Sequence, residues 1–159
     1  MIDKKEIERK WIVNKNNIPD ILIPYEYNNI VQFYTENGVR YRLCEGIDLN
    51  TKYYKTEKFG EGLVRVEKES EITSTEYNEM VEKLSPFIPI TKIRYKIKFG
   101  KDVIELDEFD TGECYAEIEF NSEQEALEFT DPPAWFGKEV TGDNTHSNFT
   151  IYTKMQQKV

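Results

Sequence analysis

Six segments of this chain alternate charged and apolar residues with a period of two, which is the side-chain repeat of a β-strand. In residues 91–99, Lys92, Arg94, Lys96 and Lys98 alternate with apolar side chains. The other five segments are residues 5–13, 39–43, 63–72, 103–109 and 115–120. Each segment would carry charge on one face and apolar side chains on the other. The pattern predicts an antiparallel sheet with one charged face.

Helix and turn signals lie between these segments. Thr73 and Glu76 have the spacing of a capping box and predict a helix over residues 74–84, and Ser122 and Glu125 predict another over 122–129. Residues 18–34 predict a short helix followed by a strand. Glycines at positions 60, 62, 100 and 112 predict hairpin turns. We therefore expect one α+β domain over residues 1–159, mainly antiparallel β, with helices packed on the apolar face of the sheet.

Composition and charge exclude several classes of function. With 21 Lys and Arg against 30 Asp and Glu, the net charge is −9, so no basic surface attracts a nucleic acid from a distance. No apolar run approaches the roughly 18 to 20 residues of a membrane span, and the first eleven residues lack a secretion signal. Two cysteines and one histidine are too few for a disulfide framework or a Cys-based zinc site. We expect a cytoplasmic protein without nucleic-acid or membrane partners.

The charges of the predicted sheet are sorted by sign. Arg40 and Arg42 share one strand face, and Glu117 and Glu119 share another. An open sheet with its charged face in water remains one interpretation. If the sheet closes instead, the charged faces line a polar bore, which is costly unless a ligand fills it.

Two sets of side chains could hold such a ligand. Glu6, Glu8, Glu117 and Glu119 offer only carboxylate oxygens, which suit Mg²⁺ or Mn²⁺. The basic set can bind phosphoryl oxygens and comprises Lys10, Arg40, Arg42, Lys58, Arg65, Lys92 and Arg94. A divalent cation and several fixed cations around one polyanion are typical of phosphoryl transfer.

Several motifs together resemble the CYTH domain, or triphosphate tunnel metalloenzyme, superfamily. The most specific is Glu6-Ile-Glu8-Arg-Lys10-Trp11. The resemblance then runs through Gly38-Val-Arg40-Tyr-Arg42-Leu43, residues 58–69, Lys92-Ile-Arg94-Tyr95, Glu105-Leu-Asp107, Glu117-Ile-Glu119-Phe120 and residues 133–143. It covers nearly the whole chain, in the family's order.

The resemblance implies an eight-stranded antiparallel β-barrel that forms a tunnel for triphosphate, with helices packed on its outside. Carried over by position, the metal ligands would be Glu6, Glu8, Glu117 and Glu119, with Glu67 and Glu69 as further candidates. The phosphates would be held by Lys10, Arg40, Arg42, Lys58, Arg65, Lys92 and Arg94. The cofactor would be Mg²⁺ or Mn²⁺. Barrels of this family often pair, so a homodimer is possible.

The resemblance also implies an activity, the hydrolysis of inorganic triphosphate to pyrophosphate and phosphate. Lys10 would stabilise charge in the transition state, and Glu119 would orient and deprotonate the attacking water. Three alternatives stay open: a nucleoside or thiamine triphosphatase, a class IV-type adenylate cyclase, and a polyphosphate- or nucleotide-binding module without catalysis.

One segment departs from the family's pattern. Thr145-His146-Ser147-Asn148 stands where a basic–aromatic pair usually precedes the asparagine. His146 either replaces a lost phosphate contact or is a histidine whose hydrogen bonds are satisfied within the fold.

Overall fold

Nine strands and three helices make up the computed structural model, which describes residues 2–157. The strands are β1 (Ile2–Val13), β2 (Glu26–Tyr34), β3 (Arg40–Gly46), β4 (Thr51–Phe59), β5 (Val64–Ile72), β6 (Ile90–Phe99), β7 (Asp102–Phe109), β8 (Cys114–Glu119) and β9 (Phe136–Glu139). The helices are α1 (Ser74–Leu84), α2 (Glu123–Glu128) and α3 (Asn148–Gln156), with 3₁₀ turns η1 (Lys15–Asn17) and η2 (Asn144–His146). None of these helices has the length and apolar character that crossing a membrane requires.

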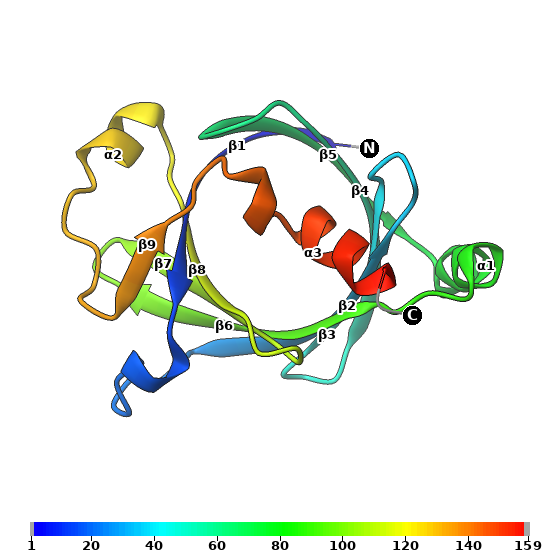
Figure 1. The fold of residues 1–159 in the computed structure, drawn as a ribbon, viewed down its shortest axis with the longest axis horizontal. Helices are drawn as coiled ribbons and strands as arrows, with labels where there is room; N and C mark the ends of the chain where they lie inside the picture. Colours follow the sequence, from blue (N-terminus) through cyan, green and yellow to red (C-terminus); the bar gives the residue numbers. More distant parts are fainter. Residues whose placement is uncertain (1, 158–159) are drawn as a thin grey trace.

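Eight of the strands form a closed antiparallel barrel. Neighbouring strands follow the order β5-β4-β3-β2-β6-β7-β8-β1, and β5 pairs back onto β1, where Arg65 lies opposite Glu6. Figure 1 shows the resulting ring of strands around a central opening. The short strand β9 pairs with the last residues of β1, beyond the stretch that pairs with β5. The barrel expected from the family resemblance is confirmed, and the open sheet is excluded.

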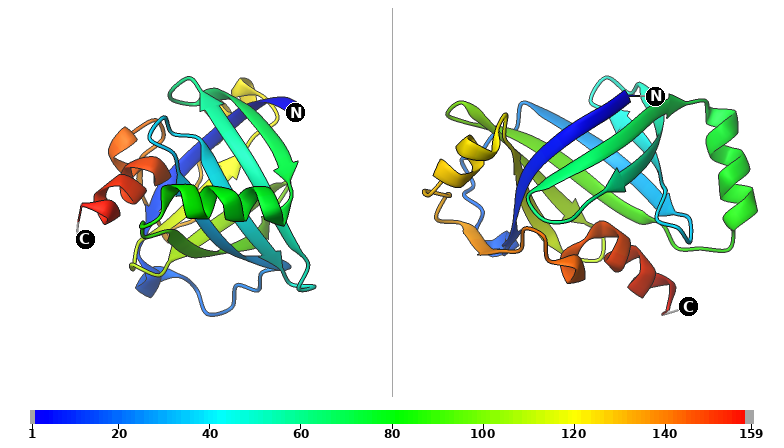
Figure 2. Two further views of the ribbon diagram at one scale, coloured as in Figure 1. Left: turned by 90° about the vertical axis from the view of Figure 1, so that its right-hand side faces the viewer. Right: turned by 90° about the horizontal axis from the view of Figure 1, so that it is seen from above.

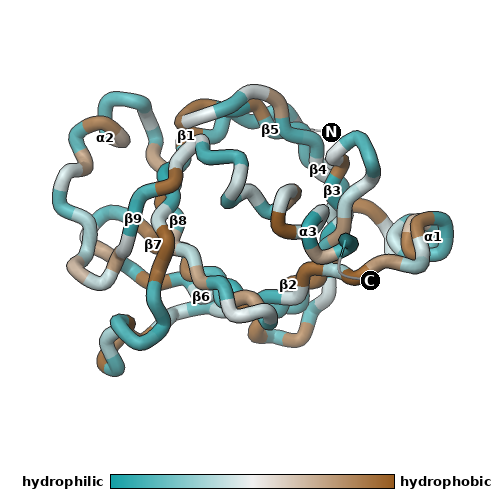
Figure 3. Tube along the Cα trace, viewed as in Figure 1, coloured by the Kyte–Doolittle hydropathy of each residue, from teal (hydrophilic) through white to brown (hydrophobic). Residues whose placement is uncertain are grey.

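The alternation of residue types sorts side chains between the inside and the outside of the barrel. Hydropathy alternates along the strands in Figure 3. Apolar side chains form two clusters. One lies on the outside of the barrel around Trp11, Ile104 and Ile118. The other joins Phe33, on the outside, to Ile90 and Phe109, which share the inward face of Lys92 at the end near α3. Loops and helices cover the outer parts of these clusters, and Ile151 and Tyr152 of α3 pack against the inward part of the second one.

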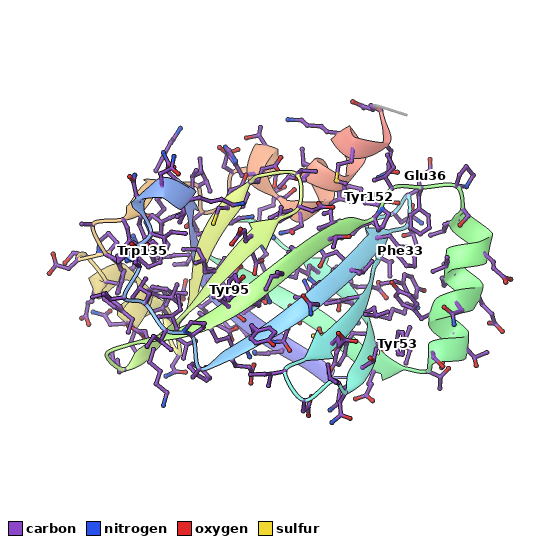
Figure 4. All side chains as sticks on the ribbon, turned by 90° about the horizontal axis from the view of Figure 1, so that it is seen from below. Phe33, Glu36, Tyr53, Tyr95, Trp135 and Tyr152 are labelled. Atoms are coloured by element: carbon purple, nitrogen blue, oxygen red, sulfur yellow. The ribbon has the colours of Figure 1, made fainter. Side chains whose placement is uncertain are left out.

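Helix α1 covers one of the two clusters. Thr73 caps it with the predicted capping box, and Tyr77 is buried against the barrel. Phe33 and Tyr53 point toward this helix in Figure 4, with ring centroids 5.4 Å and 5.0 Å from that of Tyr77. Helix α2 is capped by Ser122 and buries Ala126 in the other cluster. Both helices lie outside the barrel, as Figure 2 shows.

The short helix predicted at the start of residues 18–34 is wrong. Residues 18–25 form a loop, and only the strand that follows them, β2, was predicted correctly. Pro19 and Pro24 leave four residues between them, too few for a stable helix. Ile18 and Leu22 pack instead on the outer core. Strands β4 and β9 and helix α3 were not predicted.

Helix α3 differs from the other two helices because it lies across one opening of the barrel rather than on its outside (Figures 1 and 2). Its Tyr152 and Phe149 pack against Tyr34 at the end of β2, with centroid distances of 5.5 Å and 5.4 Å. The expectation that helices pack outside is therefore confirmed for α1 and α2 and corrected for α3. Its aromatic contacts with Tyr34 hold α3 at the rim.

A buried ion network ties this opening together. Lys92 and Asp107 have 0% and 1% of their side chains exposed, and Lys92 Nζ lies 2.8 Å from Asp107 Oδ2. Arg94 donates to both oxygens of the same carboxylate, at 2.8 Å and 2.9 Å. Lys92 also donates to Asn148 Oδ1 of α3 at 3.1 Å. Burial alone would raise the pKa of Asp107, but Arg94 and Lys92 outweigh burial and hold that pKa well below its usual range.

Two glycines allow the segment before α3 to approach the β4–β5 turn. Gly142 has a φ of +74°, and a Cβ at this position would lie 2.9 Å from Gly62 Cα. A left-handed backbone conformation and a close backbone approach both favour glycine. The segment reaches the barrel opening through this contact.

We expect Gly142→Ala to lower the free energy of unfolding by about 2 kcal/mol, or about 4–8 °C in Tm, because backbone strain and a steric clash add. Gly112→Ala is the matched control: its φ is +105°, but a Cβ there meets nothing within 4 Å. This control variant should lower the free energy of unfolding by about 1 kcal/mol, from backbone strain alone. If thermal denaturation showed the same decrease in Tm for Gly142→Ala and Gly112→Ala, the proposed close approach of Gly142 to Gly62 would be contradicted.

We expect Asp107→Asn to destabilise the fold by about 3–5 kcal/mol, because Lys92 would stay buried without its counter-charge. Glu105→Gln is the control, since Glu105 makes a longer and more exposed contact with Arg94, at 3.5 Å, and should cost less than about 1 kcal/mol. Because the folded-state pKa of Asp107 is lowered, its stabilisation is present above about pH 4 and is lost as the pH falls further. The difference between wild type and variant in urea denaturation should therefore shrink below about pH 4.

Candidate active site

The inward strand faces and residues 140–149 enclose a cavity of about 680 Å³. Twelve of the thirteen predicted site residues line it: Glu6, Glu8, Lys10, Arg40, Arg42, Lys58, Arg65, Glu67, Glu69, Arg94, Glu117 and Glu119. These residues come from β1, β3, β4, β5, β6 and β8. Closure of the barrel therefore brings together side chains that are far apart in the sequence.

The thirteenth residue, Lys92, is not among the residues that line the cavity. Its ammonium group is enclosed between Asp107 and Asn148. Burial lowers the pKa of Lys92 to about 7, while Asp107 acts in the opposite direction. A direct contact between Lys92 and phosphate stays a prediction.

The acidic wall of the cavity comes from β1 and β8. Glu8 lies opposite Glu119 in the strand register, and Lys10 lies opposite Glu117. Burial and then the neighbouring Glu117 raise the pKa of Glu8 well above its usual value. Burial would also raise the pKa of Glu117, but a hydrogen bond with Glu8 and the charges of Lys10 and Arg94 lower it. This crowding of carboxylates favours a proton or a cation between them.

The donor set fits a hard divalent cation, because it is made only of carboxylate oxygens. Within residues 2–157, no three acidic, His or Cys side chains already converge as a set of metal ligands. Instead, basic neighbours contact the carboxylates: Lys58 lies 3.2 Å from Glu6, and Lys4 lies 2.9 Å from Glu119. A bound cation would therefore compete with two lysines for these oxygens.

The basic wall centres on three arginines. Burial, and then the charges of Arg40 and Arg94, lower the pKa of Arg42 to about 9. The Nε atom of Arg40 is buried and has no hydrogen-bond partner. Buried donors without partners are rare in folded proteins. Together, the mutual repulsion and the free donor favour an anion at this position.

Lys10 lies where the acidic wall meets the segment before α3. Its Nζ donates to the backbone carbonyl of His146 at 2.7 Å and lies 4.4 Å from the centre of the Tyr115 ring. Burial lowers its pKa, while Glu117 and Glu8 act in the opposite direction. Lys10 therefore has neutral immediate partners and carboxylates nearby.

His146, in the segment that departs from the family's pattern, has one ring nitrogen hydrogen-bonded within the fold. Its Nδ1 lies 2.8 Å from the hydroxyl of Tyr115, and its carbonyl accepts from Lys10. Because His146 also lines the cavity, it lies close enough to contact a ligand. The contact with Tyr115 supports the interpretation as a satisfied histidine.

The sequence interpretation missed the lining residues Lys4, Tyr34 and Asn148, and it placed Lys96 on the charged strand face without assigning it a role in the site. Lys4 continues the alternation of Glu6 and Glu8 by one more step, so an earlier start of the first strand would have identified it. Lys96 lies on the charged face of its strand and pairs with Glu26 at 3.1 Å. Asn148 belongs to the segment that departs from the family's pattern, but its place in the cavity depends on how α3 packs.

Comparisons with known proteins agree with this arrangement, although no protein-family model matches the chain. An inorganic triphosphatase from Acetivibrio thermocellus is 36% identical over 152 residues, covering 92% of this chain and 92% of that protein. An inorganic triphosphatase from Nitrosomonas europaea is 37% identical over 102 residues, covering 62% and 66%.

Solved structures show the same fold. The crystal structure of the inorganic triphosphatase NE1496 matches with a TM-score of 0.58 and 29% identity, covering 92% of this chain and 93% of that one. A putative adenylate cyclase from Bacillus halodurans, at 18% identity and a TM-score of 0.54, shares the fold alone. With its closed charged barrel and a relative that matches almost end to end, the chain belongs to the CYTH, or triphosphate tunnel metalloenzyme, family.

Proposed function

We propose that this protein hydrolyses inorganic triphosphate to pyrophosphate and phosphate in the barrel cavity, with Mg²⁺ or Mn²⁺ as its cofactor. The observation that carries the proposal is an arginine cluster with an unpartnered buried donor, Arg40 Nε, in the same cavity as a carboxylate wall. An anionic substrate that carries its own cation matches both walls at once. The relatives named inorganic triphosphatase support this substrate.

Glu6, Glu8, Glu117 and Glu119 would hold the metal, with Glu67 and Glu69 as further ligands. When bound, such an ion polarises phosphoryl oxygens and activates water. The carboxylates supply only hard oxygen donors, which suits either ion.

The arginines would hold the phosphate chain. Arg40, Arg42 and Arg94 line the cavity, where their N–H groups that are not bound within the protein can donate to phosphoryl oxygens, and Lys58 and Arg65 add positive charge. Because the cavity lies inside the barrel, where access to water is restricted, these charges act more strongly on the substrate than they would in bulk water. Lys92 would support this set indirectly, because it donates a hydrogen bond to Asn148, which lines the cavity.

Lys10 and Glu119 would act on the terminal phosphoryl group. A water oxygen forms a bond to the terminal phosphorus, the bridging P–O bond breaks, and pyrophosphate leaves. Glu119 would accept the proton that the water loses, and Lys10 would stabilise the charge that develops on the phosphoryl oxygens. These roles agree with the positions of the two residues on adjacent strands, β1 and β8.

We expect rapid phosphate release from inorganic triphosphate with Mg²⁺ or Mn²⁺, and none with EDTA. ATP and thiamine triphosphate should react at least about tenfold more slowly, because the cavity matches a bare polyanion. Parallel phosphate assays on the three substrates would test this. Cyclic AMP and pyrophosphate formed from ATP would identify a cyclase, and triphosphate binding without any product would identify a binding module.

The double variant Glu6→Gln, Glu8→Gln should lose metal-dependent turnover by about 100-fold or more, because two metal ligands lose their charge. Glu108→Gln is the matched control, since Glu108 pairs with Lys15 and is not among the residues that line the cavity. Wild-type turnover in the double variant, measured across a range of Mg²⁺ concentrations, would refute the proposed metal site.

A further inference from the structure

Gln32 is a fully buried polar residue with no part in the roles described above. It lies on β2 with 0% of its surface exposed, and it is not among the residues that line the cavity. Its Oε1 accepts two hydrogen bonds from Arg42, from Nε at 2.9 Å and from Nη2 at 2.7 Å. Two bonds on one edge of the guanidinium fix the direction of that group.

The orientation of the Gln32 amide is itself fixed. Its Nε2 donates to the Tyr34 hydroxyl at 3.1 Å and lies 3.5 Å from Asn148 Oδ1. Rotating the amide would place its NH₂ group against the donors of Arg42 and its oxygen against Asn148. The oxygen therefore stays directed at Arg42.

Arg42 differs from five of the other cavity cations in the charge of its partner. Carboxylates pair with several of the others: Lys4 with Glu119, Lys58 with Glu6, Arg94 with Asp107, Lys96 with Glu26 and Arg40 with Glu69. Among the described residues, no carboxylate forms an ion pair with Arg42; its bound partner is the neutral amide of Gln32. Gln32 therefore orients the guanidinium and leaves its charge uncancelled.

We propose that Gln32 is a positioning residue that aims Arg42 at a phosphoryl group in the cavity and preserves the full positive charge of Arg42 for that anion. Gln32 occupies the edge of the guanidinium formed by Nε and Nη2, so the Nη1 donors are left for the ligand. A carboxylate here would give the same geometry but remove the charge. The identity of the anion rests on the proposed function.

Gln32→Glu separates geometry from charge, because it keeps the oxygen that accepts from Arg42 and nearly the same volume. It replaces the Nε2 donor, which faces Tyr34 and Asn148, with a second oxygen. The charge-assisted bonds from Arg42, together with a hydrogen bond donated by the Tyr34 hydroxyl, should offset the lost Nε2 donor and keep Tm within a few degrees of wild type. Binding of triphosphate in EDTA, measured by isothermal titration calorimetry, should nevertheless weaken about 10- to 100-fold. In turnover assays with metal, KM should rise by a similar factor with a smaller change in kcat.

Asn28→Asp is the matched control for added charge. Asn28 lies four residues earlier on the same face of β2, opposite Arg94, whose charge Asp107 already matches. Its new carboxylate should weaken triphosphate binding by less than about threefold. A folded Gln32→Glu protein with wild-type affinity and KM would overturn the proposal, and so would an equal loss in Asn28→Asp.

Gln32→Met provides a second test should Gln32→Glu not fold. It keeps the side-chain volume but removes the oxygen that accepts from Arg42, so the guanidinium is no longer held in its orientation. Triphosphate affinity should therefore fall about tenfold. Wild-type affinity in this variant would overturn the proposal. Wild-type protein that binds triphosphate in EDTA but releases no phosphate with metal would refute the proposed hydrolysis and leave the role of Gln32 intact.

Discussion

The pairing of β5 with β1 determines the surroundings of the charged side chains on the inward strand faces. In an open sheet these side chains would face water, where an ion pair contributes little. The closed barrel restricts their access to water, so both attraction and repulsion between them grow. Contacts such as Lys58 with Glu6 and the network around Asp107 follow from that enclosure.

Enclosure does not neutralise all the charges equally. Glu8 and Glu117 lie together on the acidic wall, and the pKa of Glu8 is raised as a result. Arg42 lies beside Arg40 and Arg94, and its pKa is lowered. A cation against one wall and an anion against the other would relieve both kinds of repulsion. The cavity therefore favours a ligand that combines the two charges, which is the physical basis of the proposed metal–triphosphate site.

The segment from β9 to α3 completes the cavity at one end. Its course depends on the close approach of Gly142 and Gly62, and its Asn148 contacts the buried Lys92. Through His146 it also contacts Lys10, the residue proposed to stabilise the transition state. This short segment connects the rim of the barrel to both the buried ion network and the acidic wall.

The sequence by itself determined the strands with alternating charge, the capped helices α1 and α2, and the division of candidate residues into acidic and basic sets. These features depend on local rules: a period of two, capping spacing and residue chemistry. Family resemblance, rather than periodicity, predicted that the sheet closes. Only the tertiary structure decided the loop at residues 18–25, the place of α3, the burial of Lys92 and the contact between Gln32 and Arg42. Each of these depends on packing between residues far apart in the sequence, which no local pattern encodes.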